Sequence, residues 1–132
     1  MVETKTSLVW MVHALTGPEG LKGRLSLESG DVVFRPEAKG SGEWVFRHSE
    51  IRRVRRVLGS PVLELRLERP QGPPVVGFYF VRPPSLKAPE NAHLVRRRAV
   101  RRTAMIELRR ANLLRKREVA EWARAIREAH IG

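Results

Sequence analysis

LELRLE, residues 63–68, alternates a leucine with a charged residue at every position. Successive side chains of a β-strand point to opposite faces, so this stretch predicts a strand with one dry and one wet face. The same period of two recurs over residues 21–28. Ser29-Gly30 follows at once and predicts a tight hairpin, because glycine accepts a positive φ.

Five further short strands are expected around these two, between turns rich in glycine and proline. They lie at residues 8–15, 32–34, 44–46, 52–58 and 75–81. The segment 52–58 also has apolar residues at every third position, which suits a helix, but its short length between hairpins favours a strand. Seven strands at hairpin spacing predict an antiparallel sandwich or barrel.

The part of the chain after Pro83-Pro84 has the character of helix. From Asn91 to His130 there is no glycine or proline, and good helix formers dominate. An apolar stripe at helical spacing lies near the end, at Val119, Trp122, Ile126 and Ala129. We predict a single domain over 1–132, made of a barrel (8–82), a loop (83–90), a basic helical insert (91–111) and a capping helix (112–130). Whether the last two form one helix or two stays open.

Apolar positions in the strands and in the last helix carry a family resemblance. They are Leu21, Gly23, Leu25, Leu27, Val32, Phe34, Ile51, Val54, Leu63 and Trp122. In this order they resemble the pleckstrin-homology (PH) superfold, and within it the GRAM-like and bacterial PH-like domains. The resemblance implies a mainly β, α+β fold: a seven-stranded antiparallel barrel capped by an amphipathic helix. It also implies a non-catalytic binding module, with a structural-core role for Trp122, Ile126 and Val119. The chain departs from the family pattern at residues 85–110, where a basic helical segment precedes the cap.

The composition points to anionic partners. Lys and Arg number 26 against 14 Asp and Glu, a net charge of +12. Such an excess favours lipid headgroups, an acidic protein face or nucleic acid, although an arginine excess can also reflect GC-rich coding. We expect an anionic lipid or protein surface rather than nucleic acid, and a homo-oligomer is possible.

Several chemistries have no support in the sequence. The chain has no cysteine, which excludes disulfides, thiolate catalysis and cysteine-ligated zinc. Its four histidines lack metal-ligand spacing, and no nucleophile elbow or dinucleotide-binding glycine motif is present. We therefore expect no enzyme activity, metal or small-molecule cofactor. The N-terminus lacks a basic signal-peptide region and the apolar run 8–15 is too short to span a bilayer. We therefore expect a cytoplasmic location, which is compatible with peripheral attachment at the membrane.

The strongest candidate site is the basic helix. From Arg96 to Gly132 there are twelve Lys or Arg and four Asp or Glu, so this stretch carries +8 of the net charge. Val95, Ala99, Ile106 and Leu113 form a narrow apolar stripe on it. A basic amphipathic helix is typical of a membrane-surface or partner-groove contact, while a helix folded back on the barrel is equally compatible. The candidate anion-binding residues are Arg96, Arg97, Arg98, Arg101, Arg102, Arg109 and Arg110.

Two weaker basic clusters lie on strands. Lys22 and Arg24 match the closing Lys/Arg-x-Arg element that phosphoinositide-binding relatives carry, although a solvated hairpin is the favoured interpretation. On 52–58, Arg53 and Arg55 are expected on one side and Arg52 and Arg56 on the other. A charged sheet edge, which prevents edge-to-edge pairing, is favoured there over a phosphate site.

These observations give one leading hypothesis and two alternatives. The leading hypothesis is a PH/GRAM-like module that acts as a peripheral-membrane or protein-interaction adaptor through its basic surface. The first alternative is a nucleic-acid-associated protein that binds phosphates through the same helix. The second is a subunit of an oligomer or complex that uses the helix as a docking arm.

Overall fold

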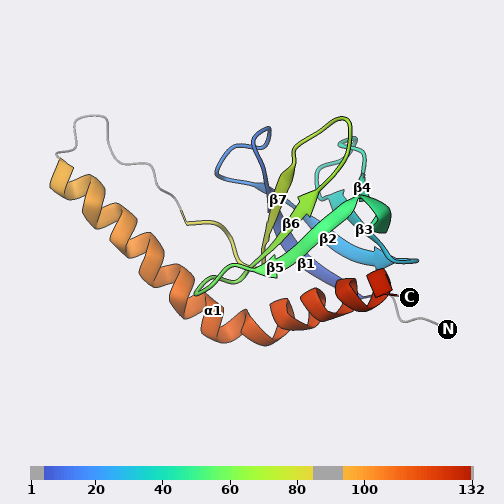
Figure 1. The fold of residues 1–132 in the computed structure, drawn as a ribbon. Helices are drawn as coiled ribbons and strands as arrows, with labels where there is room; N and C mark the ends of the chain where they lie inside the picture. Colours follow the sequence, from blue (N-terminus) through green and yellow to red (C-terminus); the bar gives the residue numbers. More distant parts are fainter. Residues whose placement is uncertain (1–4, 85–93, 132) are drawn as a thin grey trace.

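The computed structural model describes residues 5–84 and 94–131, and the side chains of helical residues 98–129. The seven predicted strands are followed by helix, and the question of one helix or two is settled in favour of one long helix (Figure 1). A short 3-10 helix, η1 (His48–Glu50), precedes the fifth strand. The other elements are β1 (Thr6–Val12), β2 (Leu21–Glu28), β3 (Asp31–Pro36), β4 (Trp44–Phe46), β5 (Ile51–Arg56), β6 (Val62–Leu67), β7 (Val75–Tyr79) and α1 (Leu94–Ile131).

The strands form one antiparallel sheet in the order β4-β3-β2-β1-β7-β6-β5. The predicted hairpin turn is confirmed, since Glu28 pairs with Asp31 and both Ser29 (φ 52°) and Gly30 (φ 86°) adopt a positive φ. In the described part of the chain the edge strands β4 and β5 do not pair with each other, so the sheet is not strictly closed. The expected barrel is thus a curled sheet with two edges.

The predicted segment 52–58 is a strand as far as Arg56, which excludes its helical alternative. The expected arrangement of its arginines is wrong. The pairing of β5 with β6 shifts between Ile51 and Arg53, a β-bulge. The extra residue lets Ile51 and Val54, three positions apart, both turn into the core. Arg52 therefore does not share the core side with Arg56, and all four arginines of the strand are exposed. The period of three in the sequence reflects this bulge.

The core lies between the inner face of the sheet and the C-terminal part of α1. The inward residues of β1 to β7 meet Trp122, Val119, Ala123 and Ile126, which are almost completely buried. The helix packs against β5, β6 and η1. It is continuous across the expected boundary at residues 111 and 112. Figure 1 shows its C-terminal part beside the sheet and its N-terminal part extending away from it.

Candidate anionic-surface interface

The N-terminal part of α1 presents a continuous exposed surface of basic and apolar side chains. Residues three and four apart are neighbours on a helix. Ile106 therefore lies among Arg102, Arg109 and Arg110, and Leu113 is flanked by basic residues at the same spacings. We call this surface the basic face, and it consists of Arg102, Ile106, Arg109, Arg110, Leu113, Lys116 and Arg117.

Both apolar residues of the basic face are open to solvent. Ile106 is 44% exposed and Leu113 is 80% exposed. On a different face of the same helix, Ala104 is buried and Leu108 is half-buried. The sequence left two arrangements open: a contact with an external surface, or a helix folded back on the barrel. Because Ile106 and Leu113 are exposed, their stripe is not folded back against the sheet. Exposed aliphatic side chains on a helix are available to an external apolar phase.

The arginines of this region lack compensating charge. Glu107 is the one acidic residue between Arg98 and Lys116. Farther along, Arg115 lies 3.6 Å from Glu118 and Arg117 lies 4.0 Å from Glu121, both long ion pairs. Five exposed arginines have no carboxylate within ion-pair distance among the described residues: Arg98, Arg101, Arg102, Arg109 and Arg110.

Two of the candidate arginines fall outside this description. Arg96 and Arg97 belong to α1, but their side chains, like that of Val95, lie outside the described residues. In the other direction, the candidate set omitted Lys116 and Arg117. Their spacing from Leu113 was the available signal, because they follow it by three and four residues.

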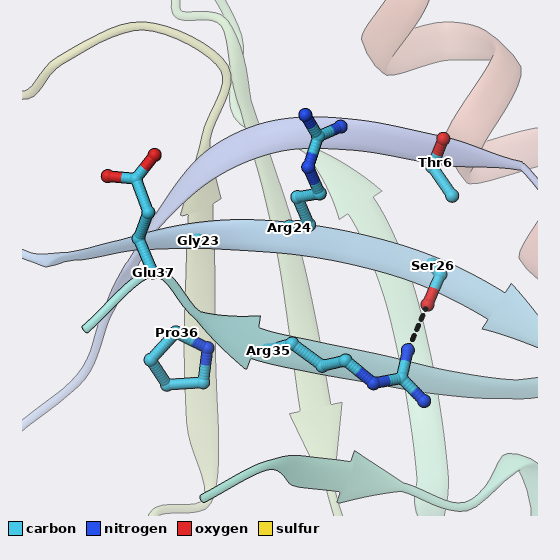
Figure 2. Close-up of a pocket in the computed structure, with 7 residues that line it drawn as sticks. All are labelled: Thr6, Gly23, Arg24, Ser26, Arg35, Pro36 and Glu37. Atoms are coloured by element: carbon cyan, nitrogen blue, oxygen red, sulfur yellow. Dashed lines mark hydrogen bonds between the residues drawn. The ribbon is translucent and has the colours of Figure 1, made fainter. Parts of the chain in front are cut away.

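In the second candidate, on the outer face of the sheet, Lys22 has an acidic partner and Arg24 has none among the described residues. The Lys22 ammonium lies 3.6 Å from Glu37 and 5.7 Å from the ring centroid of Trp10. Arg24 lines a shallow hollow of about 270 Å³ and pairs across strands with Arg35. Figure 2 shows Arg24 extending across β1, while Arg35 lies along β3 and donates to Ser26.

Arg35 is not free to bind an external anion. Its guanidinium lies 2.7 Å from Glu28 and 3.1 Å from Glu43. The hydrogen bond from Arg35 lowers the pKa of Glu28, and that carboxylate in turn raises the pKa of Arg35. Arg24 is thus the one described cation of the hollow without a carboxylate within ion-pair distance.

The arginines of β5 divide into paired and unpaired residues. Arg52 lies 2.6 Å from Glu68 and Arg55 lies 2.9 Å from Glu64. Arg53 and Arg56 have no carboxylate within ion-pair distance among the described residues. The pairs fit a charged sheet edge, since β5 is an edge strand.

The histidines do not form a metal site within the described residues. His13 is buried beside Trp44, with ring centroids 5.0 Å apart, and its Nδ1 accepts a hydrogen bond from the Leu15 amide. Burial lowers the pKa of His13. Burial against Trp44 and the hydrogen bond from Leu15 therefore favour the neutral ring and a packing role for His13.

A single curled antiparallel sheet, followed by a helix that covers its inner face, is the arrangement that the resemblance implied. The seven-stranded antiparallel sheet and its single C-terminal helix match a PH-like fold. A search of solved structures finds similarity to the Vps36 N-terminal PH domain, with 18% sequence identity and a TM-score of 0.44, over 80% of this chain and 78% of that one. No protein-family model and no curated protein matches the chain. At this level of similarity the PH-like assignment rests on the strand order and the position of the helix.

The PH-like fold accounts for only one end of α1. Hydrogen bonds between the helix and the strands involve Glu118, Trp122 and Arg127, all in its C-terminal part. The basic face begins sixteen residues before Glu118, at Arg102. It is therefore an addition to the PH-like core. No helix in the described part of the chain is long and apolar enough to cross a membrane.

Proposed function

We propose that the chain is a non-catalytic binding module that attaches peripherally to an anionic membrane through the basic face of α1. One observation carries the proposal: exposed arginines without carboxylate partners surround exposed aliphatic side chains on one helix surface. Cations near an anionic leaflet gain about 1 kcal/mol each, and apolar side chains between them can enter the headgroup boundary.

The mixed chemistry of this surface favours a membrane over nucleic acid. A phosphate backbone rewards cations but gains nothing from Ile106 and Leu113. Aromatic side chains that could stack on bases are absent from residues 98–117, and Trp122, farther along the helix, is buried. Nucleic acid remains the alternative that the experiment must exclude.

Vesicle binding tests the electrostatic part of the proposal. The full chain is cosedimented with phosphatidylcholine vesicles that contain phosphatidylserine, at low and high NaCl. The triple variant Arg102→Gln, Arg109→Gln, Arg110→Gln should bind roughly 100-fold more weakly at low salt, since it loses about 1 kcal/mol for each cation. A matched control removes three exposed arginines elsewhere (Arg47→Gln, Arg53→Gln, Arg82→Gln) and should bind nearly as well as the wild type. Equal losses in both variants would show that net charge, and not this surface, governs attachment.

The apolar residues distinguish the two anionic partners. Ile106→Ser with Leu113→Ser should weaken vesicle binding but leave any binding to duplex DNA unchanged, because only the bilayer offers an apolar phase. Binding to DNA with no binding to vesicles would overturn the membrane proposal in favour of a nucleic-acid role. If the chain binds neither vesicles nor DNA, the membrane proposal is wrong, and docking on a protein becomes the proposed role of the basic face.

A further inference from the structure

A second hollow lies where α1 crosses the end of β5, away from the basic face. Its volume is about 270 Å³. The helix contributes positions 120, 123, 124 and 127, which fall on one face because they are spaced i, i+3, i+4 and i+7. The lining residues are Arg56, Ala120, Ala123, Arg124, Arg127 and Glu128.

The strand and the helix each direct arginine into this hollow for a structural reason. Arg56 is the last residue of β5 and lies two positions after the buried Val54, so it points toward the helix side of the sheet. It remains exposed because the strand ends there. Arg124 and Arg127 lie one helical turn after Ala120 and Ala123, whose small side chains leave the space open.

One of the three guanidinium groups is held in place by the backbone. Arg127 Nη2 donates to the Val54 carbonyl oxygen at 2.9 Å. This contact covers part of the free edge of β5, which opposes addition of another strand there. The other N–H groups of Arg127 remain available to a ligand, since a guanidinium carries five donors.

The charges of the hollow are unbalanced. Arg56, Arg124 and Arg127 have no carboxylate within ion-pair distance among the described residues, whereas the neighbouring Arg52 and Arg55 are both paired. Glu128 is the single acidic residue in the lining. Three cations and one anion give the lining a net charge of +2, which a ligand with two negative charges would neutralise.

We infer that this hollow binds the phosphate group of a phosphate monoester. Planar guanidinium groups match the oxygens of phosphate with paired hydrogen bonds, and three of them around a dianion satisfy both its charge and its acceptors. The alanine floor offers no competing polar group. The volume suits a phosphate with a small attached group rather than a large cofactor. The inference does not depend on the membrane role of the basic face.

The test uses inorganic phosphate, titrated into the full-length protein at constant ionic strength and followed by two-dimensional NMR. Amides of β5 and of α1 around the hollow should shift, and Arg124→Gln should weaken binding at least tenfold. The matched control Arg53→Gln, on the same strand but outside the hollow, should bind like the wild type. Saturable shifts that map to the basic face instead, or an Arg124→Gln variant that binds like the wild type, would overturn the inference.

A vesicle arm separates free phosphate from a lipid source. Phosphatidic acid carries a phosphate monoester, so its vesicles are compared with phosphatidylserine vesicles of equal charge. If the ligand is a lipid, Arg124→Gln should reduce binding to phosphatidic acid selectively; if it is soluble, only the NMR titration should respond. The triple variant of the basic face should keep its phosphate binding in either case, so failure of the membrane proposal would not be mistaken for failure of this one.

Discussion

Ser7 joins the first strand to the C-terminal helix through both of its hydrogen-bonding functions. Its Oγ accepts a bond of 2.8 Å from Trp122 Nε1–H and donates one of 3.1 Å to Glu118 Oε2. The indole is fully buried, so without this hydroxyl its N–H would have no partner. One serine thus satisfies the polar group of the largest buried side chain.

Ser7→Ala should destabilise the protein by about 1–3 kcal/mol, the cost of leaving a buried donor unsatisfied. In a Trp122→Phe background the same change should cost much less, because no indole N–H remains. Urea denaturation of the single and double variants measures this coupling. Ser41→Ala in an exposed loop, the control, should stay within about 0.5 kcal/mol of the wild type. Equal costs of Ser7→Ala in both backgrounds would contradict the assigned role of the hydroxyl.

The pairing of β2 with β3 depends on the absence of a side chain at Gly23. A Cβ built there would lie 2.4 Å from the Arg35 carbonyl oxygen and 2.7 Å from Phe34 Cζ. The Phe34 ring occupies the space that a side chain would need, as aromatic rings do beside glycines in sheets. A glycine is therefore required at this position of β2 by close contact with β3, and not by a turn.

Gly23→Ala should cost at least about 1–3 kcal/mol, because the backbone of β3 must shift to admit the methyl group. Gly77→Ala, in β7, is the matched control: its Cβ would meet its nearest neighbour, Val62 Cγ1, at an ordinary 3.6 Å. Thermal unfolding of both variants tests the difference. Similar melting temperatures for the two would mean that β3 relaxes around the added methyl group without loss.

Local patterns predicted the elements, but not their non-local relations. Alternation is a local property, so the seven strands and the inner position of Gly23 could be expected. The period of three over 52–58 was a signal of the bulge near Arg52, but the bulge itself and the unclosed sheet depend on register between strands, which one stretch alone does not determine. On the helix, the charge of the basic face was evident from composition. The exposure of Ile106 and Leu113 was not, since other apolar residues of the same helix, Ala104 and Leu108, are less exposed and the pattern alone did not separate the two sets.

Among the described residues, ion-paired arginines lie mainly on the sheet and most unpaired arginines lie on α1, although Arg24, Arg53 and Arg56 of the sheet are unpaired too. Around the sheet, Arg35, Arg52 and Arg55 stand within ion-pair distance of glutamates. On the basic face of α1, the neighbours of Arg102, Arg109 and Arg110 are basic or apolar residues. Attractive pairs thus stabilise the folded sheet, while residues 96–132 carry +8 of the net charge of +12.

This layout predicts opposite effects of salt on two variants with the same net charge. Replacing Arg102, Arg109 and Arg110 with Gln relieves repulsion, and should raise stability at low salt by roughly 0.5 kcal/mol, or about 2 °C in melting temperature. Replacing Arg35, Arg52 and Arg55 with Gln removes attractive pairs and should lower stability at low salt. Both differences in stability should be present at about 0.01 M NaCl and disappear at about 1 M NaCl, because the Debye length shortens from roughly 30 Å to 3 Å. Scanning calorimetry at the two salt concentrations measures them. If the two variants respond alike, then the stability of this chain follows its total charge and not the placement of its arginines.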